Sequence, residues 1–370
     1  MTNHKMTEKQ IQAALIMFWM GSLVVIAINP ETKQDSWVSS LLAAIMAVPL
    51  LFLYIRLCFL YPGKNLFEIV LQIFGKIFGR IFILIYVLFS IHLGSMVMKT
   101  FSSFIRILNM PETPEPAIIF FIILLSIWMV KSGPETIGRM SKYTWPILGT
   151  SVVITFLIAI KDMNISNLKP ILNTDLKALF SGAFTLFTLP LGEAIICLSL
   201  FSSFDTHTHV SRFLFKGLAL ALTVLLLVNL RNILVLGFPS ATMFYFPSYE
   251  TVSIISIGDF FSRVEVLIGI NLMLTGFIKS SICLYTASLG LTKLLNAPDQ
   301  KPYVVPCSLL MATLSGMLYT NSLEMMDFIK YYTIYAIPFE IIFPLIILIG
   351  AEIQTRSRRS NAESPSASES

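Results

Sequence analysis

The sequence predicts an all-helical membrane protein with about ten transmembrane helices. Three observations carry this prediction: 55% of the 370 residues are hydrophobic, only 13% are charged, and the mean hydropathy is +0.78. Soluble domains carry about a quarter charged residues, because a solvated surface needs them. The composition therefore excludes a secreted domain, a cytosolic enzyme and a nucleic-acid-binding protein, and membrane lipid is the expected surrounding of the chain.

Apolar runs recur along the chain at close to the ~20 residues that a helix needs to cross the hydrocarbon core. They are continuously apolar instead of alternating, which favours helices over a β-barrel. These runs predict one transmembrane domain over 11–352. A segment 1–10 precedes it, and a polar tail over 353–370, expected to be disordered, follows it. The predicted spans are 11–28, 36–60, 81–105, 117–131, 143–160, 179–202, 213–236, 263–290, 303–321 and 333–352.

Lysine and arginine are distributed unequally between the two sides of the predicted bundle. Sixteen lie on the side of the termini and eight on the opposite side, while Lys99 and Lys279 fall inside spans. Positive residues are enriched in cytoplasmic loops, so both termini are predicted to be cytoplasmic. Residues 66–77 place apolar side chains on one helical face, which predicts an amphipathic helix at the cytoplasmic interface or packed under the bundle.

Four ionisable residues stand out inside the predicted spans, where estimates for one charge begin at about 2.5–3.5 kcal/mol. They are Lys99, Glu193, Lys279 and Glu340. Lys99 lies near the end of its helix, where its long side chain can reach the headgroups. Glu340 lies between two prolines, so it serves either a ligand or a broken stretch of backbone.

Glu193 follows a sequence that disfavours a regular helix. Pro190 removes a backbone donor and Gly192 weakens the turn, so we expect an unwound segment here, with Thr188 beside it. Unwound backbone at membrane depth is tolerated where it lines a cavity or is buried in protein. A kink alone does not need an acid, so Glu193 favours a cavity over a kink bonded to a neighbouring helix.

Span one carries a second candidate break at Gly21 and Ser22, although small residues also permit close helix packing. Spans one and six are equivalent if the chain consists of two repeats of five helices, about 11–160 and 179–352. Paired broken helices in corresponding positions are typical of the binding site of a transporter. The expected architecture is therefore a five-plus-five inverted repeat with a pocket at the midplane, although the two halves show no letter-by-letter repeat.

Span eight presents Thr275, Lys279 and Cys283 on one helical face, and we expect this face to look into the cavity. Lys279 is too deep to reach the headgroups easily, so its ammonium needs an acceptor. The carboxylate of Glu193 and the unwound carbonyls of span one are the candidates. The alternative is a structural lysine bonded to a carbonyl away from any ligand.

Other polar residues have simpler explanations. His92 in span three is typical of a hydrogen bond between helices, although near a cavity it could titrate. Asn229, Arg231 and Asn232 close span seven on the outer side, which predicts an interfacial role.

The sequence shows no carrier of enzyme chemistry. It contains no Gly-rich phosphate loop, no His-Glu-x-x-His motif and no serine nucleophile with a base. The four cysteines form no Cys-x-x-Cys pair, and we interpret them as small hydrophobic side chains. His207 and His209 lie in a short loop without further His or Cys nearby, so we expect no metal ion and no cofactor.

Four short motifs occur in an order that resembles one known family. They are Tyr-Pro-Gly-Lys at 61–64, Pro-Leu-Gly-Glu at 190–193, Phe-Pro-Ser-Tyr at 246–249 and Arg-Val-Glu at 263–265. The chain resembles the B subunits of GerA-type germinant receptors, the spore germination permease family, over about residues 7–352. This family belongs to the amino acid-polyamine-organocation superfamily.

The resemblance implies the five-plus-five fold with broken helices one and six, and a location in the spore inner membrane. It also implies two partners, an A subunit with soluble domains and a lipoprotein C subunit. The ligand pocket would lie between the broken helices and beside span eight. With the face of span eight included, the candidate ligand-binding residues are Gly21, Ser22, Thr188, Pro190, Gly192, Glu193, Thr275, Lys279 and Cys283.

Three functions follow as hypotheses. The first is a receptor subunit that binds a small germinant, an amino acid or similar metabolite, and signals through its partners. The second is a proton-coupled amino acid transporter with Glu193 or His92 as the titrating group. The third is a structural subunit whose cavity is vestigial.

Overall fold

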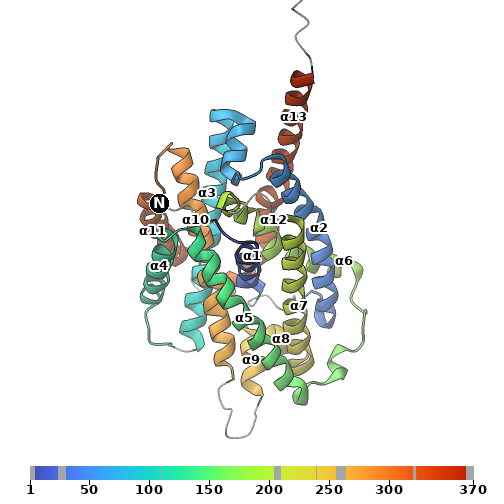
Figure 1. Cartoon of the computed structure of the whole chain (residues 1–370). Helices are drawn as coiled ribbons and strands as arrows, with labels where there is room; N and C mark the ends of the chain where they lie inside the picture. Colours follow the sequence, from blue (N-terminus) through green and yellow to red (C-terminus); the bar gives the residue numbers. More distant parts are fainter. Residues whose placement is uncertain are drawn as a thin grey trace, which may run out of the picture.

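The computed structural model describes residues 5–23, 31–108, 110–203, 210–238, 240–255, 264–319 and 322–363, and this described part is helical, without strands (Figure 1). Its α-helices are α1 (Glu8–Leu23), α2 (Ser36–Leu60), α3 (Leu66–Leu108), α4 (Glu115–Lys131), α5 (Pro134–Ala159), α6 (Leu176–Leu186), α7 (Val210–Leu236), α8 (Ser240–Met243), α9 (Pro247–Ile254), α10 (Val266–Leu294), α11 (Lys301–Leu318), α12 (Ser322–Ile337) and α13 (Phe343–Glu363).

The described part also contains short 3₁₀ and π-helical stretches that interrupt or extend the α-helices. They are η1 (Lys33–Asp35), η2 (Ile160–Asp162), η3 (Ile165–Leu168), η4 (Phe187–Leu191), η5 (Gly192–Ser203) and η6 (Pro338–Ile342).

Seven helical stretches are long and apolar enough to cross a membrane, so the chain is a multi-pass membrane protein. They are Lys33–Leu60, Leu66–Ile107, Pro134–Asp162, Leu176–Ser203, Val210–Leu236, Val266–Leu294 and Asp327–Ser357. The other three predicted spans correspond to α1, α4 and α11, which have 16, 17 and 18 residues in the described part. The count of ten spans stays a prediction.

α1 lies at the centre of the bundle, between α5, α7 and α10 (Figure 1). Nearly all side chains from Ile11 to Met20 are buried, because this helix is apolar on every face. The stretch from Phe187 to Phe201 is buried throughout for the same reason. The two elements predicted to be broken therefore form the interior of the molecule, and the other long helices surround them.

The predicted amphipathic helix and span three form one element, α3, with a kink at Gly75. Gly75 has φ 71°, in the left-handed region that glycine adopts without steric cost. Leu66 and Phe67 before the kink are fully buried, so this segment packs under the bundle. Glu68 of this segment forms an ion pair with Lys293 of α10, with 2.8 Å between Oε1 of the glutamate and Nζ of the lysine.

The predicted disordered tail begins too early. α13 continues as a helix to Glu363, so the expectation of disorder is wrong for 353–363, while 364–370 lie outside the described residues. Extending an existing helix adds one hydrogen bond for each residue fixed, so a polar sequence can follow a membrane helix without ending it. Arg56 of α2 also pairs with Glu352 on this helix.

Candidate functional site

Span six loses regular α-helical geometry at the proline, as predicted. α6 ends at Leu186, and the π-helical turn η4 follows, in which Leu189 has non-helical angles of φ −111° and ψ 66°. The chain then continues as the 3₁₀ helix η5 from Gly192. Pro190 supplies no N–H to the hydrogen-bond ladder, so the turn around it is wide and carries Glu193 inward.

Span one ends near its predicted break, but not at the two residues named for it. Gly21 and Ser22 lie in the last turn of α1, which is helical to Leu23. Residues 24–30 lie outside the described residues.

Glu193 and Lys279 form an ion pair, and both side chains are fully buried. The lysine Nζ also donates to the hydroxyl of Ser22, and the hydroxyl of Tyr332 donates to Glu193 Oε1 at 2.9 Å. The Nζ lies 4.6 Å from the ring centroid of Phe18, within cation–π range. Ser22, Glu193, Lys279 and Tyr332, which we call the ion-pair cluster, thus join α1, η5, α10 and α12.

Gly21 lets α10 approach α1 at the ion-pair cluster. A Cβ at this position would lie 2.8 Å from Cδ and 2.9 Å from Cβ of Lys279, and 3.3 Å from the carbonyl oxygen of Thr275. These distances are shorter than ordinary carbon contacts. A side chain at position 21 would therefore push the lysine away from its partners.

A second buried acid, Glu340, lies beside the cluster in the π-helical turn η6 of the last span. A Cβ on Gly192 would collide with its carboxylate, so Gly192 and Glu340 are in contact across the two irregular helices. Neither carboxylate oxygen of Glu340 has a hydrogen-bond partner within the described part of the chain. A buried polar group without a partner is costly, which makes Glu340 a candidate functional group.

A small cavity adjoins the ion-pair cluster, and we call it the midplane cavity. Gly21, Ser22 and Glu193 line it, as the sequence predicted for a pocket between the broken helices. Sequence reasoning missed its other lining residues, which come from α3, η4, the end of α11 and α12. They are Leu93, Met96, Val97, Thr100, Leu189, Tyr319, Met325 and Ile329. The four from α3 share one helical face by their spacing, but that signal also describes ordinary core packing.

The remaining predicted site residues lie near the cavity without lining it. Thr188 and Thr275 donate their hydroxyls to carbonyls of their own helices. Pro190 is buried within η4. Cys283 packs against α3, where a Cβ added to Gly94 would lie 3.0 Å from the Cβ of Cys283. Of the predicted face of α10, Lys279 and Thr275 meet α1, whereas Cys283 meets α3.

Two other polar residues of α3 lie elsewhere. Lys99 is 6% exposed and bonds Glu115 of α4 at 2.9 Å, so an acid, and not the headgroups, satisfies it. His92 lines a separate groove with Phe328 and Tyr335. Within the described ranges, no three His, Cys, Asp or Glu side chains are grouped so that they could hold a metal ion.

The comparison with family models decides which family this arrangement belongs to. A model described as spore germination protein matches residues 5–349. The chain belongs to the spore germination protein family. A curated member, spore germination protein KB of Bacillus subtilis (strain 168), is 23% identical over 364 residues, which are 97% of this chain and 97% of that protein.

Solved structures similar to this member of the spore germination family are transporters. Mhp1, a nucleobase-cation-symport-1 family transporter with bromovinylhydantoin bound, matches with a TM-score of 0.65 at 14% identity, over 94% of this chain and 80% of that one. MhsT in complex with L-phenylalanine matches with a TM-score of 0.60 at 13% identity, over 90% and 87%. At these identities the likeness concerns the fold, which is that of transporters of the amino acid-polyamine-organocation type. Family and fold are thus those of transporters and receptors, not enzymes.

Proposed function

We propose that the chain is the solute-binding subunit of a nutrient germinant receptor. A small germinant, an amino acid or a similar metabolite, binds in the midplane cavity and changes the packing of α1 against the broken helix. The observation that carries this proposal is the position of the cavity, beside a buried ion pair and at a break in a buried helix. Such a combination is costly in lipid and has a clear use at a ligand site.

The cavity suits a small amphipathic solute. Leu93, Met96 and Ile329 offer apolar contacts, while Ser22 and Thr100 offer hydroxyls. The carboxylate of Glu193 is the expected partner of a solute ammonium.

Glu193 also supplies the means of signalling. It bonds Lys279 of α10 and Tyr332 of α12, so it holds η5, α10 and α12 together. A solute ammonium that competes for this carboxylate favours a packing in which one of these bonds is released. Only a solute with different affinities for the two packings can shift their populations.

The proposal includes the surroundings of the subunit. Family membership and the name of the KB relative support a role in spores. We place the chain in the spore inner membrane, with both termini in the cytoplasm as the charge distribution favours. The partners are an A subunit with soluble domains and a lipoprotein C subunit. They carry the signal onward, because binding must be read by something outside the bundle.

Nutrient-triggered germination tests this function. Spores lacking the gene are complemented with wild type, Glu193→Gln, or Met96→Trp, which fills the cavity, and each protein is quantified in spore membranes. The matched control is Leu124→Trp on α4, at a residue that is 52% exposed on the apolar outer surface. We expect Glu193→Gln and Met96→Trp to lose the response to one nutrient, and Leu124→Trp to keep it. Unchanged germination with Glu193→Gln and Gly21→Leu, in an assembled complex, would indicate a vestigial cavity.

A proton-coupled transporter is the second candidate, and Glu340 is the observation that favours it. Glu340 is buried with no hydrogen-bond partner for its carboxylate oxygens among the described residues, and such an acid is held most cheaply with a proton bound; it also touches the broken helix at Gly192. Uptake of labelled amino acids into proteoliposomes with an imposed pH gradient separates the two functions. A receptor binds the solute without net flux, whereas a transporter accumulates it and loses this accumulation in Glu340→Gln.

A further inference from the structure

Arg231 of α7 is a buried cation that the midplane cavity does not use. The sequence predicted an interfacial role for it, whereas its side chain is 0% exposed. Its Nε and one terminal nitrogen donate to Asn232 Oδ1, and the other terminal nitrogen donates to Thr155 of α5 at 2.8 Å. These bonds use three of the five N–H groups of a guanidinium.

No acid neutralises this arginine within the described part of the chain. Across residues 5–23, 31–108, 110–203, 210–238, 240–255, 264–319 and 322–363, Arg231 forms no ion pair with a carboxylate. Both of its hydrogen-bond partners there, Asn232 and Thr155, are neutral. Burying an ion without a counter-charge costs several kcal/mol, on the order of the whole stability of a domain. A group held at that cost is a candidate for binding an anion.

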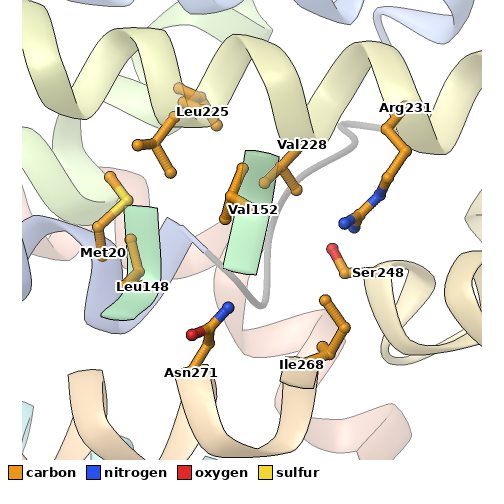
Figure 2. Close-up of a pocket in the computed structure, with 10 residues that line it drawn as sticks. Met20, Leu148, Val152, Leu225, Val228, Arg231, Ser248, Ile268 and Asn271 are labelled. Atoms are coloured by element: carbon orange, nitrogen blue, oxygen red, sulfur yellow. The ribbon is translucent and has the colours of Figure 1, made fainter. Parts of the chain in front are cut away.

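The guanidinium points into a small cavity that is separate from the midplane cavity (Figure 2). We call it the arginine cavity. Ser248 of α9 lies next to the guanidinium, and Asn271 of α10 reaches in from the opposite side (Figure 2). Asn271 is 2% exposed, and its Oδ1 has no hydrogen-bond partner in the described chain. The rest of the lining is apolar: Met20, Leu148, Val152, Val224, Leu225, Val228 and Ile268.

We propose that the arginine cavity is a second solute site, in which Arg231 binds the carboxylate of a small organic acid or amino acid and the apolar walls hold its carbon skeleton. The two N–H groups left over match the two oxygens of a carboxylate. The free Oδ1 of Asn271 accepts a hydrogen bond from a donor elsewhere on the solute. This site goes beyond the proposed function, because that function needs only the midplane cavity.

The two cavities share α1. Met20 lines the arginine cavity, and the next two residues, Gly21 and Ser22, line the midplane cavity. Successive residues of a helix point about 100° apart, so the last turn of α1 separates the two spaces. Arg231 lies towards the end of α7, which contacts α8 and α9, on the side that the charge distribution predicts to be outside.

Thermal unfolding of the purified full chain in lipid nanodiscs tests the proposal with two matched probes. Sodium propionate is compared with propionamide plus sodium chloride at the same ionic strength, so that the probes differ only in carrying a carboxylate. We expect a saturable rise of the unfolding temperature with propionate and none with the mixture. Equal shifts with both, or no shift with either, would overturn the proposal.

Variants place the effect on the arginine. Arg231→Gln is expected to weaken the apparent Kd for propionate about tenfold or more, as for the loss of a charge-assisted hydrogen bond. Val228→Phe fills the cavity and keeps the bonds of Arg231 to Thr155 and Asn232. It therefore replaces Arg231→Gln in this test if that variant does not fold. Loss of the shift in Lys279→Met together with its retention in Arg231→Gln would place the carboxylate at the midplane and contradict the proposal. This test does not measure germination, so its outcome neither supports nor contradicts the proposed function, which has its own experiment.

Discussion

At the scale of single residues, Lys279 and Glu193 depend on each other. Each is fully buried, and each would lose its ion-pair partner if the other were removed. Breaking a buried pair by removing one partner costs about 3–5 kcal/mol, whereas replacing both partners with neutral groups is often close to neutral. The contribution of the pair to stability is therefore a coupling between two residues and not a property of either one.

We predict a strong coupling in a double-mutant cycle. Lys279→Met and Glu193→Gln should each lower the free energy of unfolding by about 3 kcal/mol or more, and the double variant should recover most of that loss. Unfolding in detergent with increasing denaturant measures the four free energies. Additive losses would mean that the two side chains are solvated separately and that the ion-pair cluster does not form.

Glycine positions give a second prediction at this scale. Gly21→Ala and Gly192→Ala each put a methyl group against a buried side chain, Lys279 or Glu340, and should destabilise the protein by about 1–3 kcal/mol. Gly316→Ala is the matched control, because nothing lies within 4 Å of the added carbon. It should be neutral or stabilising, since alanine favours a helix. If all three variants lost the same amount of stability, the loss would come from the change in backbone freedom and not from close contacts.

At the scale of elements, the break in span six distinguishes a binding helix from a merely bent one. Pro190 interrupts a buried helix with a π-helical turn, whereas Pro146 lies within α5, which is assigned as one α-helix throughout. Proline thus has two consequences in the same bundle. Only the first is accompanied by an inward acid and a cavity.

Replacing the two prolines should separate these roles. Pro190→Ala restores a backbone donor and should reduce the response to a bound nutrient, while the amount of protein in the membrane stays unchanged. Pro146→Ala should leave the response intact. Nutrient-induced thermal stabilisation of the two variants is the measurement, and an undiminished response in Pro190→Ala would show that the break is dispensable.

The elements also show what the sequence could predict. Apolar runs locate the long helices, and a proline, a glycine and an acid within seven residues locate the break, because these are local signals. The contacts of Glu193 with Tyr332, and of Gly192 with Glu340, join residues about 140 positions apart, and no local pattern encodes them. The burial of Arg231 was missed for the same reason: α5, α9 and α10 enclose it from distant parts of the chain.

At the scale of the whole molecule, the two cavities lie on different sides of the central helix α1. α1 contacts α5, α7 and α10, so a shift of this helix reaches most of the bundle. This arrangement couples solute binding to the packing of the bundle through one element, provided that the bundle has two stable packings.

The predicted orientation is also a property of the whole molecule. A tag at either terminus should be digested only when protease has access to the cytoplasmic face of the membrane. A tag inserted after Lys169 should be digested when protease has access to the outer face. Protease protection in vesicles of known orientation measures this. The opposite pattern would move the arginine cavity to the cytoplasmic side.

The central claim is that the midplane cavity beside the ion-pair cluster holds a small solute. It is tested most directly by an experimental structure of the full chain in nanodiscs with a nutrient that triggers germination. The account predicts solute density between Ser22, Thr100 and Glu193, with the carboxylate of Glu193 in contact with the solute. Saturating nutrient with no density there, and an undisturbed bond between Glu193 and Lys279, would contradict it.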